Sequence, residues 1–206
     1  MRVSEIKRKT KETDVRVKVD LDRYSESAID SGSGFFNHML TLFAKFAKIG
    51  LEVGCAGDVE VDFHHSAEDI GIAMGEAFAE ALGNKKGIVR YGQCLMPMDE
   101  ALVMVALDFS GRAYLSYDVE LRASRLGDEG EETRAKVGVF DTELVEEFFS
   151  AFTRSAKLTL HVKKISGRNT HHIIEAVFKA FGKAVRDAVG IDLEYAEEIP
   201  STKGVL

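Results

Sequence analysis

The chain has 206 residues, 45% of them hydrophobic, and can therefore bury a core either as one domain or as two closely packed halves. Its formal net charge of -7 argues against a general nucleic-acid-binding protein, which depends on clustered Lys and Arg. Cys55 and Cys94 lack a disulfide-pairing signature and no apolar run approaches the roughly 20 residues that span a bilayer, so we expect a cytoplasmic protein that binds neither nucleic acid nor membrane.

The first part of the chain is expected to form strands, one loop and one helix. Val15, Val17 and Val19 alternate with charged residues, which is the period of a strand with one face in water. Apolar residues then recur at helical spacing. The expected elements are two strands within 2–21, a loop over 24–34, a helix over 35–48 and one or two strands within 51–63.

A second, longer helix is expected from His64 to Leu82, with Gly83 where a left-handed C-cap would end it. Gly71 and Gly75 lie four residues apart on this helix. Their missing side chains predict the close approach of another backbone.

The later elements are expected to repeat this order. The apolar run 101–109 predicts a buried strand, which we expect to form a hairpin with a strand over 112–121. The polar segment 123–136 predicts an exposed loop. A helix over 142–156, a strand over 157–164 and a helix over 170–189, with a left-handed C-cap at Gly190, complete the prediction.

The sequence indicates an internal duplication. The run from His38 to Val53 matches the run from Glu147 to Val162 position for position. His64 lies nineteen residues before Gly83, and His171 lies nineteen residues before Gly190. We therefore expect an α/β (α+β) protein of two halves, 1–86 and 87–206, packed as one compact domain.

The strongest local signal is a motif present once in each half. Residues 62–68 and 169–175 both consist of a capping residue, one variable residue, two histidines, two variable residues and a glutamate. Asp62 and Asn169 are predicted helix N-caps, which places the His and Glu side chains on one helix face. Adjacent histidines point about a quarter turn apart, so each helix start serves two metal ions better than one.

These motifs hold four of the six histidines, and their imidazole and carboxylate groups suit Mn, Fe, Co or Zn. Because each half supplies a matching half-site, two similar metal ions are the simplest prediction. Taken alone, His38 could equally be a buried core histidine. The candidate ligands are His38, His64, His65, Glu68, Glu147, His171, His172 and Glu175.

Other catalytic signatures are missing from the sequence. There is no HExxH, no G-x-S-x-G, no P-loop and no Rossmann fingerprint. Several cationic and hydroxyl side chains near the ends of elements are surface charges when read singly, but together they are candidates for binding a phosphate: Arg90, Arg112, Lys179, Ser201 and Lys203.

Motifs along almost the whole chain resemble the imidazoleglycerol-phosphate dehydratase family of histidine biosynthesis. The matching segments are Lys11-Glu12-Thr13, Phe36 to Leu40, Asp62 to Asp69, Arg90-Tyr91-Gly92, Met98-Asp99-Glu100, Gly111-Arg112, Gly167 to Glu175, Phe178-Lys179 and Pro200 to Gly204.

The resemblance implies a lyase that dehydrates imidazole glycerol phosphate to imidazole acetol phosphate through a metal-bound imidazolate, with two Mn(2+) per active site. It implies mixed sheets with two helices on one face of each, the helices packed between the two sheets. It also implies a homo-oligomer of 24 chains with active sites at subunit interfaces. The implied acid/base residues are Glu12 and Asp99, with Glu68 and Glu175 as further catalytic carboxylates, and the phosphate candidates keep that role.

This chain departs from the family pattern at three positions. Glu147 stands where the family often has a histidine ligand, Asn37 where it usually has Asp, and Leu42 where Gln is common. We keep Glu147 as a ligand, since a carboxylate can replace imidazole on Mn. For His161 we expect a structural role.

Two other kinds of protein fit part of the sequence. A metal-storage protein would use the same His and Glu residues but would need no phosphate anchors. An RNA-binding α/β module would have a comparable topology, but the chain is acidic and lacks a pair of aromatic and basic strands.

Overall fold

The computed structural model describes residues 1–121 and 136–206. Most of the expected loop 123–136 therefore lies outside the described residues, and its last residue, Lys136, begins a short strand. In chain order the elements are β1 Val3–Lys9, β2 Thr13–Asp20, β3 Ala28–Asp30, α1 Gly34–Ala47, β4 Gly50–Gly57, α2 His64–Leu82, β5 Tyr91–Met98, β6 Ala101–Asp108, β7 Tyr114–Asp118, β8 Lys136–Val137, β9 Phe140–Asp141, α3 Leu144–Ala156, β10 Thr159–Ser166 and α4 Thr170–Val189.

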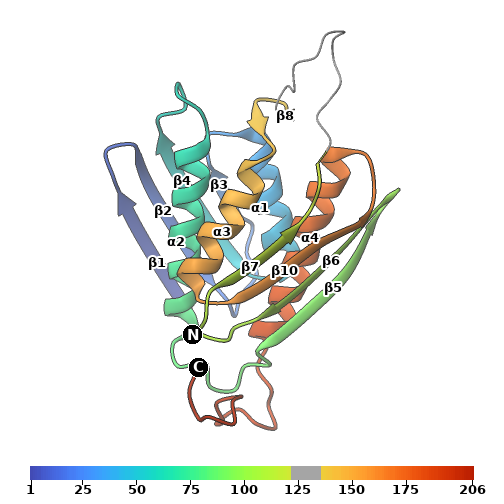
Figure 1. The fold of residues 1–206 in the computed structure, drawn as a ribbon. Helices are drawn as coiled ribbons and strands as arrows, with labels where there is room; N and C mark the ends of the chain where they lie inside the picture. The colour runs from blue at the N-terminus through green and yellow to red at the C-terminus, as the bar shows by residue number, and fades with distance from the viewer. Residues whose placement is uncertain (122–135) are drawn as a thin grey trace.

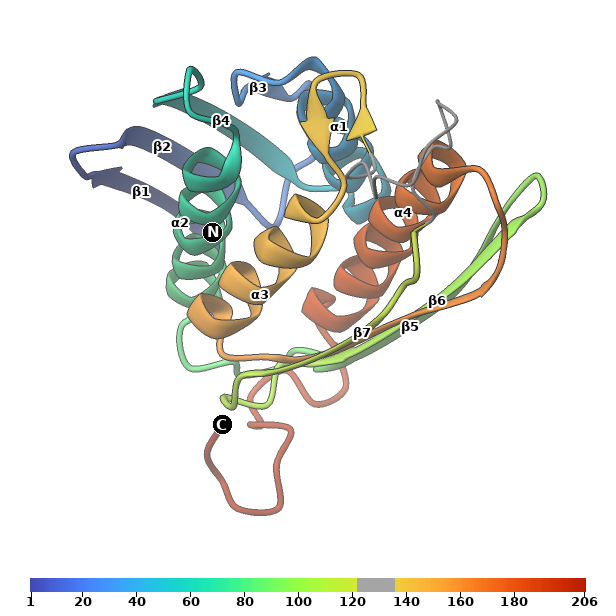
Figure 2. The ribbon, with the colours of Figure 1, turned by 45° about the horizontal axis from the view of Figure 1, so that its top comes forward.

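Two four-stranded sheets enclose a layer of helices (Figures 1 and 2). The first sheet has the order β1-β2-β4-β3 and the second the order β5-β6-β10-β7. In each, three strands are antiparallel neighbours and the last pair, β3 with β4 or β7 with β10, is parallel. The predicted fold class is confirmed, because the second half repeats the strand order of the first.

The helices pack in pairs that join the two halves. Helix α1 packs on α4, and α2 packs on α3. A Cβ atom added to Gly71 would lie 2.7 Å from the carbonyl oxygen of Phe148, and one added to Gly182 would lie 2.7 Å from that of Phe43. The predicted close approach at Gly71 is confirmed. Helices that come this near bury their apolar faces fully, and this burial is the main stabilisation of the layer.

Phenylalanine side chains fill the space between the helices. Phe43 stacks on Phe181 with ring centroids 5.0 Å apart, and Phe148 stacks on Phe178 at 5.7 Å. Each pair joins a helix of the layer to α4, and all four rings are fully buried. Truncating a buried Phe of this kind to Ala typically costs about 3–5 kcal/mol of unfolding free energy.

Two expectations about the elements are wrong, and a third is confirmed in its smaller form. β6 and β7 do not form a hairpin, because β10 lies between them; the hairpin is β5 with β6. Of the one or two strands expected within 51–63, one is present, β4, which ends at Gly57. Residues 58–63 form a turn, in which the Val61 amide donates to the Asp58 carbonyl at 2.8 Å, although their apolar residues alternate as in a strand. The loop over 24–34 contains the short strand β3, paired with β4.

The two helix-ending glycines differ in conformation. Gly83 has a φ of +53° and its amide donates to the carbonyls of Ala79 and Glu80, but its ψ of -122° lies outside the left-handed helical region. Gly190 has a φ of -54°. The left-handed helical cap is therefore wrong for both glycines, although Gly83 keeps a positive φ that favours glycine. At Gly190 the chain leaves the helix in an extended conformation that any residue can adopt.

The N-terminal ends of the helices gather at one end of the molecule. The ring of Phe140, just before α3, lies 5.3 Å from Phe36 at the start of α1 and 6.4 Å from Phe63 beside the start of α2. Phe35 in turn contacts His171, in the first turn of α4, at 5.4 Å. Both His-His motifs therefore lie at this end. Among the described residues, no helix is both long and apolar enough to cross a membrane.

Candidate metal centre

The two motif helices begin differently. The side chain of Asn169 accepts hydrogen bonds from the backbone amides of His171 and His172, at 3.0 and 3.3 Å, so the predicted N-cap of α4 is confirmed. In α2 the cap residue is Phe63, and Asp62 is one position too early. Its carboxylate still accepts from the amide of His64 at 2.7 Å, which satisfies one exposed donor of the first turn.

Three side chains from two helices form a candidate metal site. Ligand atoms of His38 on α1 and of His171 and Glu175 on α4 all lie within 4.8 Å of one another. The Glu175 Oε2 atom is 3.7 Å from His38 Nε2 and 3.3 Å from His171 Nε2. Two imidazole nitrogens and a carboxylate on one side leave further positions open on a divalent metal ion. The set combines residues from both halves of the chain.

Glu175 is held in the ionised form that a ligand requires. Burial raises the pKa of this carboxyl group, but the hydrogen bond and charge of the Lys179 ammonium, together with His38 and His171, outweigh it and leave the pKa below its usual value. The Lys179 Nζ atom is 2.6 Å from Glu175 Oε1. Lys179, one of the phosphate candidates, is therefore paired with a candidate metal ligand in this chain.

The second histidine of each motif points elsewhere. The rings of His171 and His172 are 88° apart in plane, as are those of His64 and His65. His172 Nδ1 lies 2.8 Å from Glu100 Oε2 and 3.9 Å from Asp99. The Glu100 carboxylate raises the pKa of His172, and its own pKa falls to about 2 because it accepts hydrogen bonds from His172 and Asn169.

His65 has a corresponding environment in the first half. Its Nδ1 atom is 3.0 Å from an oxygen of Asp58, and its Nε2 atom is 3.9 Å from Glu12. The hydrogen bond with Asp58 raises the pKa of His65. Each proposed acid, Glu12 or Asp99, therefore lies near the second histidine of one motif.

In the first half of the motif pair, the corresponding residues His64, Glu68 and Glu147 do not form a close cluster. Glu68 pairs with Arg154 at 3.0 Å, while His64 and Glu147 are half-buried on α2 and α3. Within residues 1–121 and 136–206, only the cluster of His38, His171 and Glu175 has the closeness of a metal site. Ligation by Glu147 stays a prediction.

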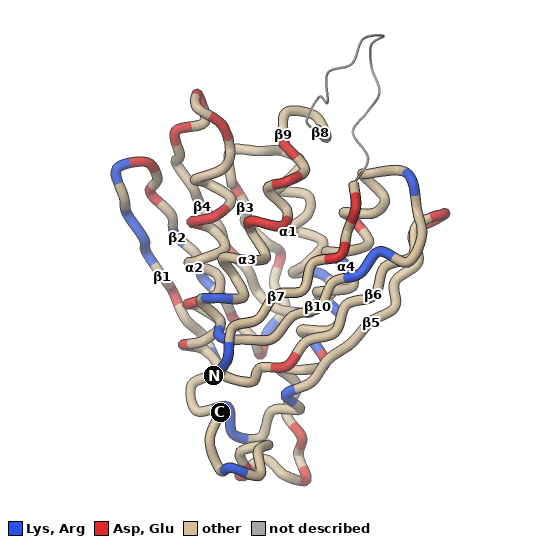
Figure 3. Tube along the Cα trace, viewed as in Figure 1, with Lys and Arg blue, Asp and Glu red and all other residues tan. Residues whose placement is uncertain are grey.

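Acidic residues offset an unfavourable field at this end. Helix N-termini carry partial positive charge, which disfavours a cation. The turn between β4 and α2 and the start of α3 are rich in Asp and Glu (Figure 3). Anionic side chains here lower the cost of placing a metal ion beside the helix starts.

The remaining phosphate candidates lie near the other end of the helices. The backbone amide of Arg90 donates to the carbonyl of Ala188 in the last turn of α4, and its guanidinium is bound by Asp108 at 2.6 Å and by the Pro200 carbonyl at 2.7 Å. Ser201 and Lys203 follow in the C-terminal segment (Figure 1). Arg112, before β7, donates to the Ser110 carbonyl at 3.3 Å. One chain does not bring these residues to the His38 cluster.

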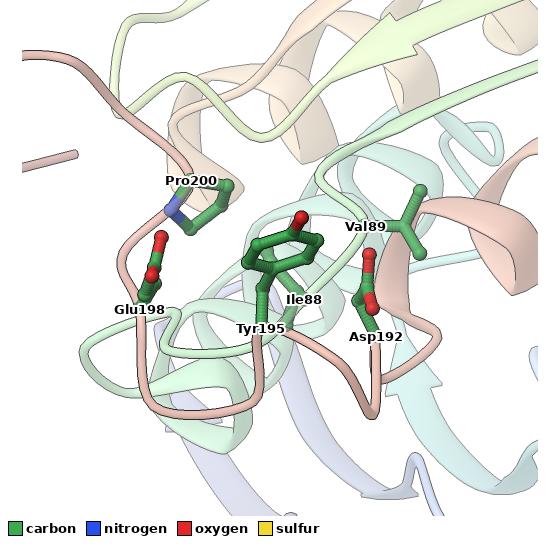
Figure 4. A pocket seen from close by; sticks show the side chains of 6 residues that line it. All are labelled: Ile88, Val89, Asp192, Tyr195, Glu198 and Pro200. Atoms are coloured by element: carbon green, nitrogen blue, oxygen red, sulfur yellow. The ribbon is translucent and has the colours of Figure 1, made fainter.

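A pocket of about 200 Å³ is lined by residues 88–89 and by the C-terminal segment (Figure 4). Its polar side chains include the carboxylates Asp192 and Glu198, which repel a phosphate. The pocket is therefore a poor phosphate site, and it contains none of the candidate metal ligands. Its lining is Ile88, Val89, Asp192, Tyr195, Glu198 and Pro200.

Sequence reasoning missed the carboxylates that hold the site in place. Asp58 and Glu100 contact histidines 7 and 72 positions away in the chain. Asp69 is 6% exposed and accepts hydrogen bonds from Arg8 at 2.9 Å and from Thr13, which ties the β1–β2 turn to α2. Glu100 and Asp69 lie within the segments that resemble the family, Met98-Asp99-Glu100 and Asp62 to Asp69, and this was the only indication of their importance in the sequence.

Comparisons with known proteins give one consistent result. Residues 31–185 match the family model "Imidazoleglycerol-phosphate dehydratase". The chain is 51% identical over 206 residues to the protein of that name from Oceanobacillus iheyensis, with 100% of both chains covered. It is 53% identical over 205 residues to that from Desulforamulus reducens, covering 100% of this chain and 98% of the relative.

Solved structures agree with this result. The crystal structure of imidazoleglycerol-phosphate dehydratase from Staphylococcus aureus superposes with a TM-score of 0.79 at 42% identity, covering 92% of this chain and 99% of that one. The Pyrococcus furiosus structure, in complex with (S)-C348, gives 0.80 at 35% identity, covering 98% and 100%.

Proposed function

Because this chain belongs to the imidazoleglycerol-phosphate dehydratase family, a hydro-lyase family of histidine biosynthesis, we propose that it dehydrates imidazole glycerol phosphate to imidazole acetol phosphate in a metal-dependent reaction. The observation that carries the metal dependence is the cluster of His38, His171 and Glu175. Its two imidazoles and one ionised carboxylate are ligands that Mn(2+) accepts, with Fe, Co or Zn as alternatives.

We propose two metal ions per active site, held by residues of the two motifs together with His38 and Glu147. Bound divalent metal supplies positive charge that favours the ionised form of the substrate's imidazole ring. The protein residues that would hold the ions are His38, His64, His65, Glu68, Glu147, His171, His172 and Glu175.

The carboxylates near the histidines are the candidates for moving protons. Dehydration requires one group to take a proton from the substrate and another to give a proton to the departing hydroxyl, which leaves as water. Glu12 lies 3.9 Å from His65, and Asp99 lies 3.9 Å from His172, so both are beside the proposed ligands. Glu68 and Glu175 are further carboxylates on the same helix faces.

We propose that the active site is completed between chains. Arg90, Arg112, Ser201 and Lys203 are suited to bind the substrate phosphate, yet they lie near the C-terminal ends of the helices. A homo-oligomer, proposed as a 24-mer, would bring them to another chain's metal ligands. We also propose that the chain consists of two duplicated halves, 1–86 and 87–206, and that the protein is cytoplasmic.

The direct test is turnover of imidazole glycerol phosphate by metal-stripped protein, with and without added Mn(2+). We expect the stripped protein to be inactive and Mn(2+) to restore dehydration. If Mn(2+) binds but restores no activity, a metal-storage role replaces catalysis.

A further inference from the structure

We propose that Asp58 and Glu100 are positioning residues, which hold the second histidine of each motif with Nε2 turned to a divalent metal ion. The inference rests on the proposed function, because it takes His65 and His172 to be metal ligands. It assigns to each motif a carboxylate that lies outside it.

Glu100 forms hydrogen bonds both with the ring of His172 and with the backbone before α4. One carboxylate oxygen lies 2.8 Å from His172 Nδ1, and the other accepts the backbone amides of Asn169 at 2.8 Å and Arg168 at 3.3 Å. Three hydrogen bonds fix the carboxylate, so the imidazole ring is fixed with it. Glu100 follows β5 at the tip of the β5–β6 hairpin, which is thereby attached to the helix start.

Asp58 performs the same task from a different element. Both of its carboxylate oxygens lie near His65 Nδ1, at 3.0 and 3.2 Å. Asp58 is itself fixed, because its amide donates to the Glu12 carbonyl at 3.1 Å and its carbonyl accepts from Val61 at 2.8 Å. The residue belongs to the turn after β4, which has no equivalent role in the second half.

The two halves thus reach one arrangement through unrelated segments. A carboxylate faces Nδ1 of the second histidine in both cases, although the first comes from the turn before its helix and the second from a remote hairpin. When Nδ1–H donates to a carboxylate, the lone pair of the neutral ring stays on Nε2, and the ring becomes a better metal ligand. Both carboxylates therefore serve the same purpose, which is to fix the orientation of the imidazole ring and to keep its proton on Nδ1.

The test measures Mn(2+) binding and does not depend on turnover. Metal-free wild-type protein, Asp58→Asn, Asp58→Ala, Glu100→Gln and Glu100→Ala are titrated with Mn(2+) and free ion is followed by electron paramagnetic resonance. We expect each Ala variant to bind about 10–100-fold more weakly at one class of site, which is the usual effect of losing such a partner. Asn and Gln, which keep the side-chain shape, should lose less.

The matched control is Glu60→Gln. Glu60 is an exposed carboxylate in the same turn as Asp58, so its removal changes the local charge equally without touching His65. We expect it to bind Mn(2+) as the wild type does. A similar loss in the control would mean that net charge, and not ring positioning, sets the affinity, and would overturn the inference.

A second readout separates positioning from general folding. In ¹⁵N spectra of metal-free protein at a pH where the rings are neutral, His65 and His172 should carry the proton on Nδ1 in the wild type and shift towards Nε2–H in the Ala variants. Unchanged tautomers and unchanged affinity in the Asp58 and Glu100 variants, with Mn(2+) binding lost in His65→Ala and His172→Ala, would overturn the inference alone. Failure of the wild type to bind Mn(2+) would overturn the proposed function as well.

Discussion

Glu175 combines three roles in one buried side chain. Its carboxylate faces the imidazoles of His38 and His171 and forms an ion pair with the Lys179 ammonium, and the residue lies one turn after the His-His pair on α4. A buried carboxylate with a nearby cation stays ionised, and an ionised carboxylate can bind metal. The Lys179 ammonium beside Glu175 therefore keeps the carboxylate in the form that can bind a metal ion.

Replacing His171 by Ala should remove the metal ion bound at the cluster. His171 is one of the two proposed nitrogen ligands, and its Nε2 atom lies 3.3 Å from the Glu175 carboxylate. Metal analysis after dialysis should show fewer ions per chain, with folding retained. His161→Ala is the matched control, because His161 is an exposed histidine on β10 that contacts Tyr114. Retention of every ion by His171→Ala would contradict the assignment.

Replacing Lys179 by Met should shift metal binding to higher pH. Lys179 lowers the pKa of Glu175, so its loss raises that pKa, and protons then compete with metal at pH values where the wild type still binds. The Mn(2+) affinity measured against pH should fall off at a higher pH in the variant. Coincident profiles for the two proteins would show that the ammonium does not control the carboxylate.

At the scale of elements, the crossing of α2 and α3 depends on the absence of side chains. A Cβ atom at Gly71 would lie 2.7 Å from the Phe148 carbonyl oxygen, and one at Gly75 would lie 2.6 Å from that of Phe152. Backbone atoms cannot move aside as a flexible side chain can. The helices would have to separate, and both carry proposed ligands.

Gly71→Ala should therefore lower the unfolding free energy by about 1–3 kcal/mol, the usual cost of overpacking. Denaturant unfolding at a fixed protein concentration measures it. Gly34→Ala is the control, because a Cβ there meets nothing within 4 Å and Gly34 lies at the start of α1. The control should match the wild type or gain slightly, since Ala is the better helix former. Equal stability of the two variants would contradict the account of the crossing.

Local patterns predicted most elements but not how they pair. The periodicity of α4 gave its bounds, 170–189, as the structure has them. The insertion of β10 between β6 and β7 is a non-local pairing that no short window contains. Likewise, the motif spacing placed His171 and Glu175 on one face, but the contact of Glu100 with His172 depends on how a hairpin folds back, 72 residues away.

At the scale of the whole molecule, the proposed metal ligands and the proposed phosphate-binding residues of one chain lie far apart. The proposed histidine ligands lie near the N-terminal ends of the helices, while Arg90 and the C-terminal segment lie beside the last turn of α4. Helices of this layer are about 20–30 Å long at 1.5 Å per residue, which is too far for one small substrate to bridge. The proposed sharing of active sites between chains would remove this separation.

A mixing experiment tests that sharing. His171→Ala lacks a proposed metal ligand and Lys203→Glu lacks a proposed phosphate anchor, so we expect each protein alone to be nearly inactive. Co-assembled chains would contain some sites with an intact ligand set from one chain and an intact anchor from another. Activity should then reappear above the sum of the separate variants. No recovery, despite proven mixed assembly, would place both groups in one chain's site.

The most direct measurement is anomalous X-ray scattering from crystals of the metal-free protein soaked in Mn(2+). We expect a manganese peak within bonding distance of His38 Nε2, His171 Nε2 and the Glu175 carboxylate. Manganese found only at other positions, with these three side chains free of metal, would contradict it.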